Sequence, residues 1–196
     1  MTASTLPSIT LVVLWLWIVI GVVVLLLLYL VLTYNKLVRL RNETETGWAN
    51  IDTQLQRRTD LVPNLVEAVK GYAAHESETF EEITQARARA EQAATPAAAA
   101  QADAEMAPAL NRLIAVSEAY PELRASENFL KLQQELADIE DRLAAARRYY
   151  NQTVYRYHTV KQSFPAVMVA GPLGFEEREF FETDQRDPVN VSFAAA

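Results

Sequence analysis

The strongest feature of the hydrophobic pattern is an apolar run from Leu11 to Leu32, 22 residues without a charged side chain. As an α-helix it would extend about 33 Å, close to the thickness of the hydrocarbon core of a bilayer. A secretory signal peptide would have a shorter apolar core, of about 7–15 residues, between a basic start and a small-residue cleavage site. The chain has no lysine or arginine before Lys36, and the run leads into Tyr34 and Asn35. We therefore predict a retained membrane-spanning helix.

Beyond this run, apolar positions recur in alternating steps of three and four, which is the period of a helix and not of a strand. They predict a first helix from Tyr34 to Gln92. Its apolar face carries Trp48, Ile51, Leu55, Val62, Val66, Val69, Ala73, Phe80 and Ile83. Pro63 interrupts it, because proline removes a backbone donor and clashes with the carbonyl four residues earlier. The helix either kinks or restarts there; the stripe continues in phase, which favours a kinked, continuous helix.

An alanine-rich stretch follows, in which 13 of the 24 residues from Ala86 to Ala109 are alanine. Such a stretch favours a helix but offers little to bury. Thr95-Pro96 matches an N-cap followed by proline at the first helical position, so a second helix should start there. We expect it to end at Tyr120-Pro121. Its apolar side is formed by Met106, Leu110, Leu113 and Val116.

A third helix, from Ser126 to Gln162, has the most regular apolar seam of the chain beyond the span. The seam residues follow in steps of three and four over five heptads: Phe129, Leu132, Leu136, Ile139, Leu143, Ala146, Tyr150, Thr153, Tyr157, Val160 and Phe164. Long helices with short turns and such a seam are typical of antiparallel bundles and coiled coils. The fold class is therefore all-α: one transmembrane helix, then an antiparallel up-and-down helical bundle of three long helices, or four if the first breaks at Pro63.

The domain limits follow from these elements: a short N-terminus (1–10), the transmembrane helix (11–33), the bundle (34–163) and an extended tail (164–196). The tail contains three helix-breaking pairs, Phe164-Pro165, Gly171-Pro172 and Asp187-Pro188, with short apolar clusters between them. It could pack along a groove of its own bundle, contact a neighbouring subunit or lie on the membrane surface.

The distribution of charge predicts an orientation. Lys36, Arg39 and Arg41 follow the span closely, whereas no basic residue precedes it. The positive-inside rule then places the C-terminal domain in the cytoplasm and the N-terminus outside, as in a single-pass protein of the cell membrane. The formal net charge of −7 lies entirely beyond the span, which argues against a nucleic-acid partner. The chain has no cysteine, and therefore no disulfide or thiolate site.

Catalytic signatures are absent from the sequence. His75-Glu76 begins like the zinc-protease motif His-Glu-x-x-His, but the second histidine position holds Thr79. The chain has two histidines and neither the serine-hydrolase motif Gly-x-Ser-x-Gly nor a phosphate-binding Gly-x-x-x-x-Gly-Lys loop. We therefore predict no catalytic residue, no metal ligand, no cofactor and no small-molecule substrate.

A dense polar cluster accompanies the apolar stripe of the first helix. Its candidate interaction or seam residues are Trp48, Asp52, Arg57, Arg58, Asp60, Asn64 and Glu67. The run from Trp48 to Glu76, WANIDTQLQRRTDLVPNLVEAVKGYAAHE, resembles the signature of the LemA family. The resemblance continues in Tyr34–Val38, Glu118–Leu130, Ala146–Asn151 and Phe180-Phe181. It implies a bacterial protein with one N-terminal anchor, a cytoplasmic antiparallel helical bundle and no established catalytic activity.

Arg58 falls on the apolar seam, where an unpaired buried charge would cost several kcal/mol. One interpretation is structural, with Arg58 paired to Glu135, Asp138 or Asp141 of the third helix. The other is a contact face for a second subunit, formed by Arg57, Arg58, Asp60, Asn64 and Glu67, since a polar group on a seam can fix register and oligomer number.

Three functional hypotheses follow. The first is a non-enzymatic, membrane-anchored scaffold that self-assembles, or binds a membrane-protein partner, and supports envelope organisation or a stress response. A first helix longer than the third would leave an apolar stripe uncovered, which favours a homo-oligomer. The second is a receptor or adaptor for an apolar peptide or lipid in a bundle groove. The third is an enzyme, which would need convergent titratable groups in a pocket.

Overall fold

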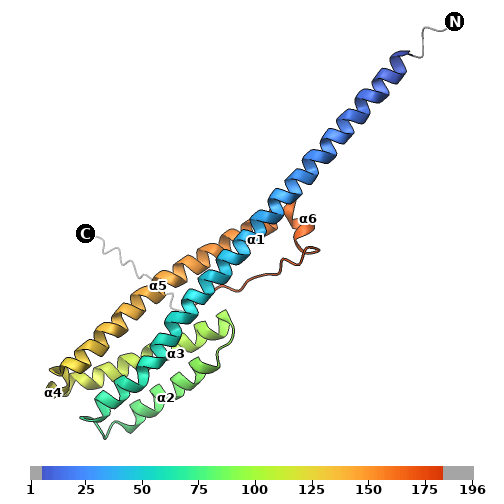
Figure 1. Cartoon of the computed structure of the whole chain (residues 1–196). Helices are drawn as coiled ribbons and strands as arrows, with labels where there is room; N and C mark the ends of the chain where they lie inside the picture. Colours follow the sequence, from blue (N-terminus) through green and yellow to red (C-terminus); the bar gives the residue numbers. More distant parts are fainter. Residues whose placement is uncertain (1–5, 183–196) are drawn as a thin grey trace, which may run out of the picture. The chain divides into compact units, whose positions relative to one another are not determined.

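The computed structural model describes residues 6–182, in which every regular element is a helix (Figure 1). The helices are α1 (Leu6–Lys70), α2 (Ser77–Gln92), α3 (Pro96–Glu118), α4 (Pro121–Arg124), α5 (Glu127–Gln162) and α6 (Ala166–Ala170). The prediction of an all-α chain with an apolar N-terminal helix and a helical bundle is confirmed. The predicted N-terminus before residue 6 and the tail after residue 182 lie outside the described residues.

The chain divides into two compact units. The first comprises the chain up to Glu43 together with Arg156–Glu177, and the second comprises Thr44–Tyr155 together with the chain from Arg178 onward. In the first unit, α1 contains the apolar run, whose residues from Leu11 to Leu32 are all exposed. A core helix of a soluble protein would bury such a stretch. By length and composition this is the one helix of the described residues that could cross a membrane.

A small apolar core completes the first unit. Its buried residues are Leu37, Leu40, Tyr157, Ala170 and Phe175, from α1, α5, α6 and the segment after α6. The Tyr157 hydroxyl donates a hydrogen bond to the carbonyl of Glu176 at 2.7 Å, and the rings of Tyr34 and Phe175 meet edge to face, with centroids 5.6 Å apart. The end of α5 and the segment after α6 are thereby packed against α1.

The second unit is a bundle with one main apolar core, to which α1, α2, α3, α4 and α5 all contribute. α1 and α5 run antiparallel, since Gly47 lies against Tyr150 and Arg58 reaches Glu140. A Cβ at position 47 would come within 3.3 Å of the Tyr150 Cα, so glycine permits this close approach of two helices. α2 and α3 form a hairpin beside them (Figure 1).

The prediction that the first helix reaches Gln92 is wrong. The helix continues through Pro63, as its in-phase stripe predicts, but it ends at Lys70, and α2 starts at Ser77 after a turn. Glycine at position 71 is a poor helix former and follows the last helical residue. Val69, Ala73 and Ile83 are all buried in the same core. The apolar period therefore persists across the turn, and the pattern alone does not show the chain reversal.

The alanine-rich helix starts as predicted but packs more closely than expected. The Thr95 hydroxyl accepts a hydrogen bond from the N–H of Ala98 at 3.2 Å, and Pro96 is the first residue of α3. Its side chains offer little surface to bury, but Ala99, Ala100 and Ala102 are buried. Small side chains let the helix approach its neighbours closely.

The seam of α5 is buried or half-buried from Phe129 to Val160, as predicted. Its last predicted member, Phe164, is instead 79% exposed, because α5 ends two residues earlier. The predicted extended tail also contains a helix: α6 starts after Pro165 and ends before Gly171. Residues 175 to 182 form neither helix nor strand.

Candidate functional site

A buried ionic cluster connects three helices of the second unit. Arg58 of α1 is 2% exposed, and its two terminal nitrogens bind different carboxylates. One forms a short ion pair with Asp103 of α3, which is buried as well. The other donates to the Glu140 carboxylate of α5 at 2.8 Å; this carboxylate is 41% exposed. The prediction that Arg58 is a buried, paired seam residue is confirmed.

The predicted partners of Arg58 are wrong. Glu135, Asp138 and Asp141 are exposed. Glu140 instead flanks the seam between Ile139 and Leu143, where a carboxylate can bend toward the core. The main partner, Asp103, lies on the alanine-rich helix and is brought into reach by that helix's close packing.

Arg147 of α5 completes the cluster. Its guanidinium lies 2.5 Å from the second oxygen of Asp103, so one carboxylate bridges two arginines. Burial lowers the pKa of Arg147, and the attraction of Asp103 opposes that shift. Together with Glu140, the four groups are formally neutral. A compensated cluster of this kind avoids the penalty of isolated buried charges and links the three helices in one arrangement.

The space beside the cluster is small. A cavity of about 30 Å³ lies against Arg58 and Asp103, lined also by Asp52, Leu55 and alanines of α2 and α3. This is about a tenth of the smallest usual pocket for a metabolite, roughly 300 Å³. Within residues 6–182, no group of three His, Asp or Glu side chains comes together in a way that could hold a metal ion.

The last part of the described chain, which we call the strap (Arg178–Glu182), docks beside this cluster. The Asn151 amide donates to the carbonyl of Phe181 and accepts from its N–H, both at 2.9 Å. The Tyr150 hydroxyl donates to the carbonyl of Glu179 at 2.7 Å, and burial raises the pKa of Tyr150. The guanidinium of Arg147 lies 5.1 Å from the centroid of the Phe181 ring. The strap thus covers the bundle where Arg147 reaches the surface.

The structure separates the predicted site residues. Trp48 is half-buried, with its ring 6.1 Å from Tyr150 and 6.4 Å from Phe181, so it supports the strap. Arg58 belongs to the ionic cluster, and Asp52 is exposed beside the small cavity. The remaining predicted residues point outward. We call the exposed row in steps of three and four the polar stripe: Thr53, Arg57, Asp60, Asn64 and Glu67.

Sequence reasoning missed Asp103, Glu140 and Arg147. The available signal was weak: Asp103 is the one acidic residue between Gln92 and Ala104 in a run dominated by alanine. An isolated acidic residue among small side chains is a candidate partner for an arginine that is buried on the seam of another helix. Glu140 and Arg147 lie beside seam positions, one residue after Ile139 and Ala146.

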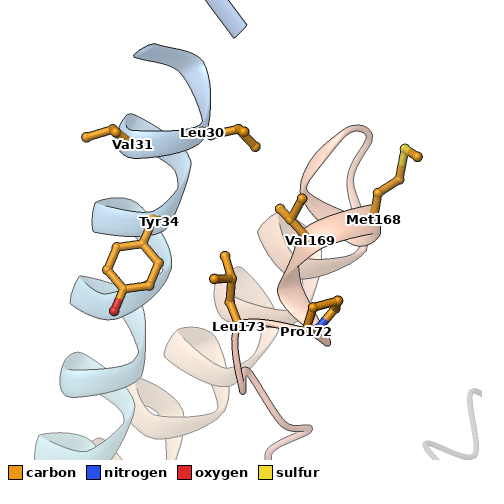
Figure 2. A pocket seen from close by; sticks show the side chains of 7 residues that line it. All are labelled: Leu30, Val31, Tyr34, Met168, Val169, Pro172 and Leu173. Atoms are coloured by element: carbon orange, nitrogen blue, oxygen red, sulfur yellow. The ribbon is translucent and has the colours of Figure 1, made fainter. Parts of the chain in front are cut away.

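A separate apolar groove of about 400 Å³ lies in the first unit. Its walls are Leu30, Val31 and Tyr34 of α1 on one side, and Met168, Val169, Pro172 and Leu173 of α6 and the turn after it on the other (Figure 2). Nearly all of its lining is apolar. The groove therefore suits hydrocarbon and offers no charged group to a polar ligand.

Comparisons with known proteins identify several related sequences. The chain is 26% identical over 178 aligned positions to the magnetosome protein MamQ 1 of Paramagnetospirillum magneticum, covering 78% of this chain and 65% of the relative. It is also 26% identical over 177 positions to the magnetosome protein MamQ of Magnetospirillum gryphiswaldense, covering 77% and 65%. The chain thus spans about two thirds of the length of these two relatives.

A further relative carries the family's own name. Protein LemA of Metamycoplasma hominis is 26% identical over 162 positions, covering 80% of this chain and 72% of that protein. Residues 47–193 match the sequence pattern that describes the LemA family. This range includes the polar stripe, the ionic cluster and the strap. The chain belongs to the LemA family.

Proposed function

We propose that this protein is a non-enzymatic scaffold, anchored in a membrane by α1, whose bundle assembles with further copies through the polar stripe. The observation that carries the proposal is that the two faces of α1 have different surroundings. Its inward side chains complete the core and the ionic cluster, whereas Arg57, Asn64 and Glu67 point outward. None of these three forms an ion pair or side-chain hydrogen bond within residues 6–182. They are therefore available to a partner.

The polar stripe replaces the uncovered apolar seam as the basis for assembly. An uncovered seam would need a first helix much longer than the third, but α1 ends at Lys70, and the residues of its apolar face from Trp48 to Val69 are buried or half-buried. The stripe has both charges: Arg57 is followed by Asp60 and Glu67. Two parallel copies that meet along it can pair Arg57 of one with Asp60 of the other. Anchoring in one plane raises the effective concentration, so weak contacts suffice.

Two of the relatives named above are magnetosome proteins, a name that refers to a cellular structure and not to a reaction. This supports a structural role, which we extend to envelope organisation or a stress response. The alternative, a receptor for an apolar peptide or lipid, is favoured by one observation, the apolar groove of the first unit.

The proposed orientation places the bundle in the cytoplasm, because Lys36 and Arg39 are exposed just after the span. The chain lacks cysteine, so Ser4→Cys and Ala88→Cys give single labelling sites. We expect an impermeant maleimide to label position 4 on intact cells and position 88 only after the cells are permeabilised. Labelling of position 88 but not of position 4 on intact cells would reverse the orientation.

Assembly through the polar stripe predicts specific cross-links. Thr53→Cys and Asn64→Cys lie on the stripe, and Ala88→Cys is an exposed control on α2. In native membranes at low salt we expect an oxidant to give disulfide-linked dimers at 53 and 64 but not at 88. The yield should fall at high salt, because exposed ion pairs are screened. Monomer at all three positions, or equal dimer at 88, would contradict stripe-to-stripe assembly.

A further inference from the structure

We propose that the segment from Phe164 to Leu173 is a second membrane contact, which inserts its large apolar side chains into the leaflet where the span ends and takes a lipid acyl chain into the apolar groove. The inference rests on the proposed membrane location of α1. It goes beyond that location, because it assigns a bilayer-bound role to a segment more than 120 residues downstream of the span.

In this segment small side chains are buried and large apolar side chains are exposed, which is the opposite of what is expected on a surface that faces water. The residues of α6 that face the protein are small: Ala166 and Ala170 are each 1% exposed. The large apolar residues face outward. They are Phe164, Val167, Met168 and Leu173, exposed by 79%, 52%, 66% and 49%. A surface that faces water does not usually gather contiguous large apolar side chains, and such patches mark contacts with a partner or a membrane.

Charge is also absent from this segment. The 14 residues from Gln162 to Phe175 form the longest run without a charged side chain outside the N-terminal span. Charged residues resume immediately on both sides, with Lys161 before the run and Glu176 after it. Glycine and proline at 171 and 172 lie in the turn that ends α6. This composition suits an interfacial segment, which buries apolar side chains without crossing the bilayer.

The groove places the segment at the level of the end of the span. Leu30 and Val31 belong to the last turns of the apolar run, and they share one groove with Met168, Val169 and Leu173 (Figure 2). If Leu30 and Val31 lie among acyl chains, the facing residues lie at nearly the same depth. Tyr34, which also lines the groove, has the amphipathic ring typical of the headgroup region. The patch is therefore continuous with the lipid-facing surface of α1.

The basic residues beside the patch match a bilayer more than they match a second protein. Lys36 and Arg39 are exposed on the turn of α1 that follows the groove, where phosphate headgroups would lie. An apolar patch with lysine or arginine at its polar edge is typical of surfaces that bind anionic lipid.

Nitroxide scanning tests the proposal on the full-length protein. We would introduce Met168→Cys and Leu173→Cys one at a time, attach a nitroxide, and reconstitute the protein in vesicles of phosphatidylcholine and phosphatidylglycerol. Collisions with oxygen, which concentrates among acyl chains, are compared with collisions with a polar nickel chelate, which stays in water. Leu27→Cys in the span and Ala88→Cys on α2 are the lipid and water controls. We expect 168 and 173 to resemble 27, with nickel accessibility about tenfold below that at 88.

The outcomes separate the occupants of the groove. High nickel accessibility at 168 and 173, equal to that at 88, would overturn the proposal. Low accessibility to both oxygen and nickel would show that protein covers the patch, which also overturns it in favour of a second copy or a peptide. Nickel access at Leu27→Cys would instead show that the span itself is not in the bilayer, so failure of the proposed anchor is recognised separately.

Discussion

Replacing Asp103 by alanine is expected to destabilise the bundle by about 3–5 kcal/mol, the cost of removing one partner from a buried ion pair. Asp103 bridges Arg58 and Arg147, and Arg58 is almost fully buried. Without Asp103, Arg58 retains only Glu140, whose carboxylate is partly solvated. The measurement is urea denaturation of the full-length protein in detergent, followed by circular dichroism.

Comparison variants show whether burial causes the loss. Glu105 lies on the same helix and pairs with the exposed Arg89, so Glu105→Ala should cost about 0–1 kcal/mol. Arg58→Met should cost less than Asp103→Ala, because it leaves Asp103 paired with Arg147. The double variant Arg58→Met with Asp103→Leu removes both charges of the buried pair. It should therefore cost less than the sum of the costs of Arg58→Met and Asp103→Leu measured separately. A cost for Asp103→Ala no larger than that for Glu105→Ala would refute the proposed stabilising role of the cluster.

The sequence identified Arg58 as a buried, paired residue because its position on the stripe is decided by helical period alone. Its partners depend on two other quantities, the flank of the α5 seam that faces α1 and the distance to α3. The seam itself is the predicted one, but the carboxylate that reaches Arg58 is Glu140 on one flank of it, whereas Asp138 and Asp141 are exposed. The distance depends on alanine packing, which has no periodic signal. Local pattern therefore predicts which residues are buried better than it predicts which residues meet.

The same limit explains the error in the first helix. Period and phase predicted burial of Val69 and Ile83 correctly, and the N-cap at Thr95 followed from local hydrogen-bonding chemistry. The turn after Lys70 returns the chain to the same core, so its apolar residues remain in phase. The one local signal for the end of the helix was Gly71, which is a weak signal and lies in the turn that follows Lys70. Of the polar stripe, Arg57, Asp60, Asn64 and Glu67 were identified from the sequence, but their exposure depends on the arrangement of α2, α3 and α5.

Replacing Phe181 by alanine is expected to cost about 3–5 kcal/mol, the usual range for a buried phenylalanine in a core. The ring is 2% exposed and packs between Trp48 and the guanidinium of Arg147. Phe164→Ala is the matched control, since that ring is 79% exposed, and we expect it to leave the stability of the bundle within about 0.5 kcal/mol of the original.

The strap can respond in two ways, which the measurement must distinguish. The strap is attached by the Phe181 ring and by the two hydrogen bonds between the Phe181 backbone and Asn151. Loss of the ring could therefore release the strap while the helices stay folded. Trp48 reports on the strap because it contacts Phe181 and Tyr150, provided that Trp15 and Trp17 are replaced by phenylalanine. Circular dichroism reports on the helices. If Phe181 holds the bundle together, both signals shift to lower urea concentration by the same amount. If it holds only the strap, Trp48 fluorescence changes before the helices unfold. Curves that match those of Phe164→Ala by both probes would show that the strap contributes nothing to stability.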